Sequence, residues 1–85
     1  MAIIHVAAWH VISESGDDYS GMIAMKERNM NTVFLDVIEG CSGEVSANMD
    51  CSELNEEDLT PEEILEECLL DPEVDWLTID TEDYN

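Results

Sequence analysis

A long apolar segment near the N-terminus constrains the fold of this chain more than any other feature. Ile3–Ser13 is rich in β-branched and aromatic residues, which favour strands. Alternate side chains of a strand point to opposite faces of a sheet. One face of this segment carries Ile4, Val6, Ala8 and Ile12, and the other carries Ile3, Ala7, Trp9 and Val11. Because both faces are apolar, we expect a central strand.

Three later segments also alternate and predict further strands. Gly16 and the Ser and Asp residues around it favour a turn, so we expect Tyr19–Met25 to form a hairpin with the first strand. Thr32–Ile38 and Val74–Asp80 alternate in the same way and predict two more strands. Short turns join antiparallel neighbours, so the first three strands are expected to form a meander.

A helix is predicted in the C-terminal half. Thr60 suits the cap of a helix, Pro61 suits the first helical position, and the acidic residues that follow suit the positive end of the helix dipole. The helix is expected to reach about Leu70, with an apolar stripe on one side and acidic residues on the other. The stripe consists of Ile64, Leu65, Cys68 and Leu69, and the acidic side consists of Glu62, Glu63, Glu66 and Glu67. Residues 40–59 predict a loop, with a short helix near 54–59.

Together these segments predict a small α+β domain. The 85 residues suffice for one domain. We expect a small antiparallel sheet of three or four strands with one acidic amphipathic helix packed on it. Residues 1–43 would form a scaffold, and residues 44–80 would form an acidic loop, the helix and the last strand. The tail, residues 81–85, is expected to be frayed.

Charge is distributed unevenly between these two parts. The chain carries 22 Asp and Glu residues against 2 Lys and Arg residues, a formal net charge of -20 at pH 7. Sixteen of the acids lie in residues 44–85, which contain neither Lys nor Arg. Hydrophobic residues still make up 45% of the sequence, which favours a packed core over a disordered acidic chain. The C-terminal part is therefore the candidate binding surface.

The predicted acidic helix sets like charges beside one another. Each pair of glutamates three or four residues apart costs roughly 0.2–0.5 kcal/mol of helix stability. Solubility of a small domain needs a net charge of only about 2–8. The additional charge therefore indicates a binding role.

Partners that are themselves anionic are disfavoured. Binding to nucleic acid or to an anionic membrane requires many cations, and the chain has only Lys26 and Arg28. The apolar N-terminal segment lacks the basic leader of a signal peptide and is too short to span a bilayer. We therefore expect a cytoplasmic protein.

No catalytic, metal or cofactor site is predicted. His5 and His10 would face opposite sides of one strand and could not share a metal ion. The cysteines, Cys41, Cys51 and Cys68, are too widely spaced for a zinc framework and are expected to be buried thiols. A catalytic carboxyl group needs an apolar pocket, whereas the acidic residues here cluster on polar faces. We therefore expect a binding protein that is not an enzyme.

Two acidic passages carry a resemblance to known proteins. Residues 61–67 (Pro-Glu-Glu-Ile-Leu-Glu-Glu) and 72–77 (Pro-Glu-Val-Asp-Trp-Leu) resemble the acidic helix-to-strand passage of the uracil-DNA glycosylase inhibitor. In size and charge the chain is similar to the acidic DNA-mimic inhibitors that bacteriophages direct against host defence, among them anti-restriction and anti-CRISPR proteins. A charge of -20 matches about 34 Å of duplex DNA, and a globule of this length is expected to be roughly 30 Å across. The resemblance implies inhibition by imitation of nucleic-acid charge.

The expected function is that of a stoichiometric inhibitor. It would block the basic DNA- or RNA-binding site of a CRISPR effector, restriction enzyme, nuclease or glycosylase, in the cytoplasm of the host cell if the source is a phage. Two alternatives remain open: an immunity protein or acidic adaptor that binds another basic protein, and a generic acidic domain without mimicry. The residues expected to contact the partner are Glu53, Glu56, Glu57, Asp58, Glu62, Glu63, Glu66, Glu67, Asp71, Glu73 and Asp75.

Overall fold

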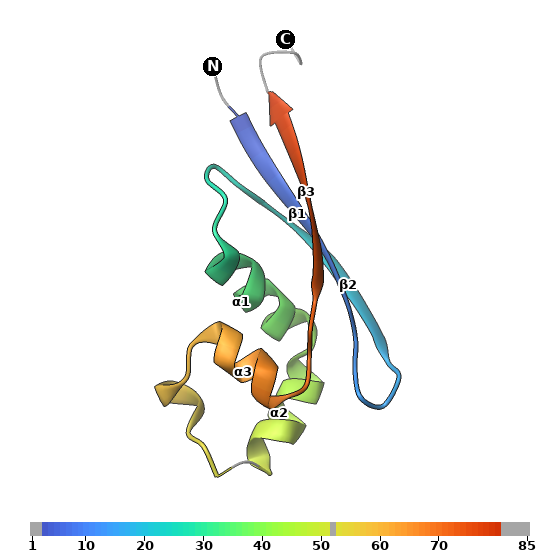
Figure 1. The fold of residues 1–85 in the computed structure, drawn as a ribbon, viewed down its shortest axis with the longest axis vertical. Helices are drawn as coiled ribbons and strands as arrows, with labels where there is room; N and C mark the ends of the chain where they lie inside the picture. The colour runs from blue at the N-terminus through green and yellow to red at the C-terminus, as the bar shows by residue number, and fades with distance from the viewer. Residues whose placement is uncertain (1–2, 52, 81–85) are drawn as a thin grey trace.

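The computed structural model describes residues 3–51 and 53–80 of the chain. Within these residues lie three strands, three α-helices and one short 3-10 helix (Figure 1). In chain order they are β1 (Ile3–Ile12), β2 (Asp18–Met25), α1 (Met30–Gly40), α2 (Ser42–Asp50), η1 (Glu56–Asp58), α3 (Pro61–Glu67) and β3 (Glu73–Asp80). The predicted α+β class with a small antiparallel sheet is therefore confirmed. The tail expected to be frayed lies outside the described residues.

The sheet has the strand order β2-β1-β3, and both neighbours of β1 run antiparallel to it. β1 is thus the central strand, as its two apolar faces predict. The C-terminal strand β3 lies beside the N-terminal strand, with Trp76 opposite Ala7 and Val74 opposite Trp9. The parts of the chain before and after residue 43 therefore differ in charge but are not separate structural units, because both contribute strands to one sheet.

The prediction of a strand at Thr32–Ile38 is wrong, since these residues belong to helix α1. Asn29 caps this helix: its side-chain oxygen accepts a hydrogen bond from the backbone N–H of Thr32 at 3.3 Å. The buried apolar residues here follow one another at intervals of four, which is a helical period and not a strand period. They are Val33, Val37, Cys41, Val45 and Met49. The cap and this buried series outweigh the strand preference of β-branched side chains.

Two further predictions change for the same reason. Residues 42–50 were expected in a loop and instead form α2, which continues the buried series through Val45 and Met49. The expected meander is replaced by the order β2-β1-β3, because a helix and not a strand follows β2. The short helix expected near residues 54–59 is present as η1.

Helix α3 begins where the sequence predicts but ends before Leu70. The Oγ1 atom of Thr60 accepts a hydrogen bond from the backbone N–H of Glu63 at 3.2 Å, and Oε1 of Glu63 accepts one from the backbone N–H of Thr60 at 3.1 Å. This reciprocal pair is a capping box. The helix ends at Glu67, because Leu69 has a left-handed φ of 57° that reverses the chain. Leu69, expected on the apolar stripe, is therefore 63% exposed, while Leu70 is 4% exposed in the core.

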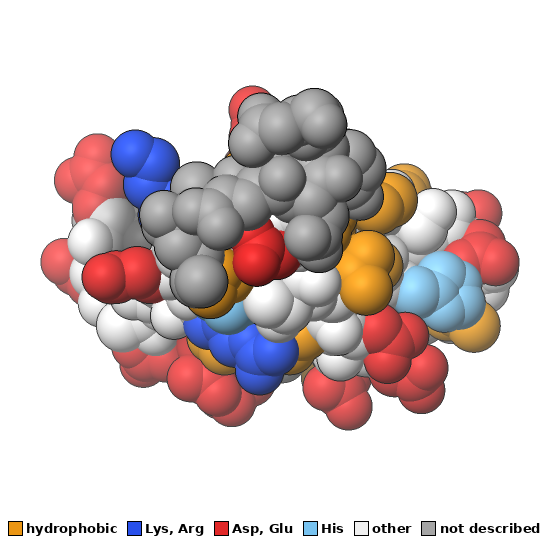
Figure 2. All heavy atoms as spheres, turned by 90° about the horizontal axis from the view of Figure 1, so that it is seen from above, with side chains coloured by type: hydrophobic (Ala, Val, Ile, Leu, Met, Phe, Trp, Pro, Cys, Tyr) orange, Lys and Arg blue, Asp and Glu red, His pale blue; other side chains and the backbone are white. Residues whose placement is uncertain are grey.

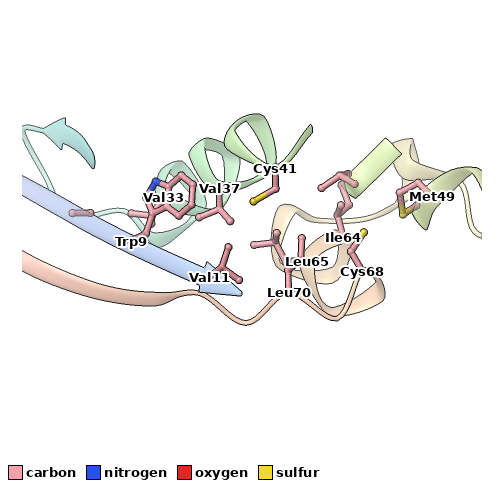
Figure 3. Packing of buried hydrophobic residues seen from close by; sticks show 12 residues of the cluster. Trp9, Val11, Val33, Val37, Cys41, Met49, Ile64, Leu65, Cys68 and Leu70 are labelled. Atoms are coloured by element: carbon pink, nitrogen blue, oxygen red, sulfur yellow. The ribbon is translucent and has the colours of Figure 1, made fainter. Parts of the chain in front are cut away.

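The core lies between the helices and one face of the sheet (Figure 3). Trp9 of β1 is 3% exposed, and its indole N–H donates a hydrogen bond to Oδ2 of Asp36 at 2.7 Å. Glycines border the ring: a Cβ on Gly21 would lie 2.6 Å from a ring carbon, and one on Gly40 would lie 2.7 Å from another. Because real Cβ atoms do not approach so closely, the position of the indole requires both glycines. The other buried apolar residues are Ala7, Val11, Val33, Val37, Cys41, Val45, Met49, Ile64, Leu65, Cys68 and Leu70.

The helices cover only part of one face of the sheet (Figure 1). The N-terminal end of β1 and the C-terminal end of β3 project past them, so the molecule measures 51 × 27 × 15 Å. It is thus longer than the roughly 30 Å expected for a compact globule. Beside this projecting part of the sheet, the guanidinium of Arg28 lies 5.2 Å from the ring centroid of Trp76 and donates to Oγ1 of Thr78 at 3.4 Å. Figure 2 looks onto this end and shows the basic side chains there among acidic ones.

Candidate anionic binding surface

Helix α3 presents its carboxylates to solvent. Ile64 and Leu65 are buried in the core and fix one side of the helix, so the opposite side faces outward. Glu62, Glu66 and Glu67 are exposed there, as the sequence predicts. With Glu63 of the capping box, α3 carries four carboxylates along about 10 Å of helix axis. One DNA strand carries about three phosphates over the same length.

Within the part of the chain that the structure describes, no Lys or Arg side chain pairs with the outer carboxylates of α3. Among the residues that the structure describes, the side chains of Glu62, Glu66 and Glu67 form no ion pair or hydrogen bond. Lys26 and Arg28 lie in the turn between β2 and α1, next to the part of the sheet that the helices do not reach. The negative potential of α3 is therefore not neutralised locally and extends into solvent.

Two adjoining hollows extend this row of charges past the end of α3. One is lined by Phe34, Glu62, Leu65, Glu66, Leu70, Asp71 and Pro72. The other is lined by Glu14, Glu66, Leu69, Leu70 and Asp71. Because Glu66 and Asp71 line both hollows, the carboxylates of Glu62, Glu66, Asp71 and Glu14 follow one another along one continuous surface.

Glu14 belongs to this surface although the sequence does not single it out. It lies in the turn between β1 and β2, far from α3 in the chain, and only the tertiary fold brings it to the helix end. No local sequence signal indicates this position. We call the set Glu14, Glu62, Glu66, Glu67 and Asp71 the α3 surface.

The residues predicted to contact a partner do not all share one surface. Glu73 and Asp75 alternate along β3 with Val74 and Trp76, which pack against the core. Both carboxylates therefore lie on the open face of the sheet, away from the helices. A third hollow, lined by His10, Val11, Ile12, Asp71 and Glu73, places Asp71 between the α3 surface and this face.

The remaining predicted residues precede α3. Glu53, Glu57 and Asp58 are exposed in the segment that leads to the helix, so they extend the acidic region along the chain. The backbone of Glu56 belongs to η1, and its side chain lies outside the described residues. Glu62, Glu66, Glu67 and Asp71 of the α3 surface are thus the most closely grouped part of the predicted set.

A separate polar cluster joins the first turn to helix α2. The hydroxyl of Tyr19 donates to Oε1 of Glu44 at 3.4 Å, and the hydroxyl of Ser15 donates to the same oxygen at 3.1 Å. Partial burial, followed by the charges of Glu44 and Asp17, raises the pKa of Tyr19 above its ordinary value of 10.0. This phenol therefore stays neutral and acts as a hydrogen-bond donor.

Two of the three cysteines lie in the core. Cys41 and Cys68 are buried, as predicted, whereas Cys51 is exposed, contrary to the prediction, because it follows the last turn of α2 at the surface. Burial and then the charge of Glu44 raise the pKa of the Cys41 thiol. A raised pKa favours the unreactive thiol over the thiolate, so Cys41 serves as a core residue.

The histidines lie on opposite faces of β1, as their spacing predicts. His5 Nδ1 lies 3.3 Å from Oγ1 of Thr78 on the helix side, and His10 pairs with Asp18 on the open face. Within residues 3–51 and 53–80, no three His, Cys, Asp or Glu side chains are grouped so as to hold a metal ion. In the same ranges, no helix combines the length and apolar character needed to cross a bilayer.

Comparisons of this chain with protein-family models, with curated proteins and with solved structures return no match. The function is therefore argued from the surface itself.

Proposed function

We propose that this protein is a stoichiometric inhibitor whose α3 surface occupies the basic nucleic-acid site of another protein. The observation that carries the proposal is the row of exposed carboxylates on α3, which no Lys or Arg neutralises within the described residues. The number of charges for each length of helix axis is similar to that of one DNA strand. A cationic cleft built for phosphates would therefore meet a similar density of negative charge.

The anchoring of α3 supports this role. The capping box fixes the start of the helix, and Ile64 and Leu65 hold it against the core. Its carboxylates are consequently held in place before binding, which lowers the entropic cost of association. The field of a fixed anionic surface also accelerates encounter with a basic partner.

The expected partner is a basic nucleic-acid-binding protein of the cell in which the chain acts. CRISPR effectors, restriction enzymes, nucleases and glycosylases all present such a site, and we place the encounter in the cytoplasm. The phage DNA mimics that this chain resembles in size and charge act on partners of this kind. Binding without turnover is sufficient for such a role.

The test compares two triple charge reversals that change the net charge equally. One reverses the outer carboxylates of α3 and keeps the capping box, and the other reverses three exposed carboxylates elsewhere. The first variant is E62K/E66K/E67K, and the matched control is E27K/E39K/D50K. Circular dichroism establishes that both variants are folded.

The DNA-binding proteins in a lysate of the cell in which the chain acts are first bound to double-stranded DNA–cellulose at low salt. The purified chain or one of its variants is then added. Wild-type protein and the control variant are expected to release a DNA-binding protein in complex with the added chain, whereas the α3 variant does not. High salt is expected to suppress the release, because it screens the attraction. Equal release by both variants, or no release by the wild type, would refute the proposal.

A further inference from the structure

The face of the sheet turned away from the helices carries a continuous apolar patch. Its residues alternate with those that enter the core, and the strand register brings them together around Val6, which lies opposite Ala24 on β2 and Leu77 on β3. Met22 and Leu77 are 69% and 58% exposed. We call this set the open patch: Ile4, Val6, Ala8, Met22, Ala24, Leu77 and Ile79.

The chain exposes more surface than its mass requires. A folded monomer of 9.6 kDa is expected to expose about 5,100 Å², whereas this chain exposes 5814 Å². The difference, about 700 Å², is close to the roughly 800 Å² that each partner buries in an interface of standard size. The radius of gyration of 14.8 Å likewise exceeds the roughly 12 Å of a compact chain of this length. This additional surface belongs to the elongated molecule as a whole, of which the uncovered face of the sheet is one part, and it is of the size that a dimer interface buries.

The positions of the carboxylates are compatible with a second copy of the chain covering this patch. Asp75 lies directly opposite Ala8 at one corner of the open patch, and Glu73 lies further along the strand, so these two carboxylates lie at one end of the open face and the rest of the patch is apolar. Two sheets packed face to face lie about 10 Å apart, and each helix layer lies roughly 10 Å behind its own sheet. The two α3 surfaces would then be about 30 Å apart, several times the Debye length of about 8 Å at physiological ionic strength. Their mutual repulsion is consequently screened for the most part.

We propose that the open patch is the interface of a two-fold dimer of this chain, in which the sheets pack face to face. A two-fold contact joins the same patch on both copies, as a self-complementary flat apolar surface allows. It removes Met22 and Leu77 from water and leaves both α3 surfaces facing outward. The dimer does not depend on the proposed inhibitory function, since each α3 surface is complete within one chain.

Sedimentation equilibrium of the full chain over a wide concentration range tests the proposal. Wild-type protein is expected to show a reversible monomer–dimer equilibrium that strengthens with added salt. Partner binding through the α3 surface weakens with salt, so the two associations are distinguished by opposite salt dependences. A wild-type protein that remains monomeric at every concentration and salt would overturn the dimer and leave the proposed function untouched.

Matched variants locate the interface. M22Q/L77Q places polar side chains of similar size in the open patch and is expected to raise the dissociation constant by at least about 100-fold. The control M30Q/L69Q makes the same two changes at exposed positions outside the patch and is expected to leave the constant within about twofold. Equal effects of the two variants would overturn the proposal by placing the interface elsewhere.

A labelling experiment on the wild type removes any dependence on variant folding. Hydroxyl-radical oxidation is compared in dilute and concentrated protein. Protection of Met22 but not of Met30 at high concentration is expected, because only Met22 lies in the open patch. Equal oxidation of Met22 at both concentrations would overturn the proposal.

Discussion

The two faces of the β-sheet are similar in sequence but differ in environment. On the covered face, Ala7, Trp9 and Val11 of β1 are almost completely buried beneath the helices. On the open face, Val6 of the same strand is only partly buried, and Leu77 of β3 is exposed. Apolar residues on both faces of a strand therefore predict that the strand lies at the centre of the sheet. They do not predict which of the two faces the helices cover. The covering helices are specified elsewhere in the chain.

The largest difference between the faces is expected for a substitution by alanine at neighbouring positions of β2. Gly21 lies on the covered face, where a Cβ would come within 2.6 Å of the Trp9 ring, whereas Ser20 lies next to it on the open face. We expect Gly21→Ala to lower the free energy of unfolding by about 3 kcal/mol, because the indole has no space to move. Ser20→Ala is expected to change it by less than about 0.5 kcal/mol. Urea denaturation followed by tryptophan fluorescence measures both, and equal stabilities would contradict the packing described around Trp9.

A matched pair of valines on β1 measures burial directly. Val11→Ala removes buried methyl groups on the covered face and is expected to cost about 2 kcal/mol. Val6→Ala makes the same change on the open face and is expected to cost about 0.5 kcal/mol in dilute protein. Chemical denaturation at low protein concentration checks both values. A larger loss for Val6 than for Val11 would reverse the assignment of the two faces.

The covered face also depends on the anchoring of α3. Thr60→Ala removes the hydroxyl that accepts from the Glu63 N–H and is expected to cost about 1 kcal/mol. In a domain of this size that loss lowers the melting temperature by roughly 4–8 °C. Thr60→Ser keeps the hydroxyl and serves as the control. If both variants melted at the same temperature, the cap would not contribute to holding α3 against α1 and α2.

The smallest effect is expected at the edge of the covered face, at Tyr19. Its pKa in the folded protein lies above 10.0 because of partial burial and then the charge of Glu44. The unfolded chain therefore ionises first, and the stability contributed by neutral Tyr19 is present below pH 10 and lost as the pH rises through the folded value. Glu44→Gln is expected to lower the pKa of Tyr19. Phenolate absorbance in a Tyr84→Phe background follows this residue alone, and an unchanged midpoint would exclude Glu44 as a cause.

The elements that the sequence predicts correctly have local signals. β1 is apolar on both faces within a single segment, and α3 carries Thr60, Pro61 and Glu63 at the positions of a capped helix start. The error at Thr32–Ile38 has an equally physical cause. The period of four from Val33 to Met49 becomes visible only over a window that crosses Gly40, and a shorter window shows the alternation of Val33, Leu35 and Val37 instead.

The candidate site was predictable only in part. The outer carboxylates of α3 follow from the helical period, because Ile64 and Leu65 fix which side is buried. The approach of Glu14 and the separation of Glu73 depend on tertiary structure. The chain reverses at Leu69 and carries β3 to the far edge of the sheet, and no local pattern encodes that placement.

Competition between DNA and this protein for one partner tests the central claim most directly. The partner released from DNA–cellulose is bound to a fluorescently labelled duplex, and anisotropy is followed as the purified chain is added. We expect complete displacement of the duplex, and we expect the titration to end when one α3 surface has been added for each DNA-binding site. A partner that holds the duplex and the chain at the same time, with unchanged anisotropy, would contradict the claim that the α3 surface occupies a nucleic-acid site.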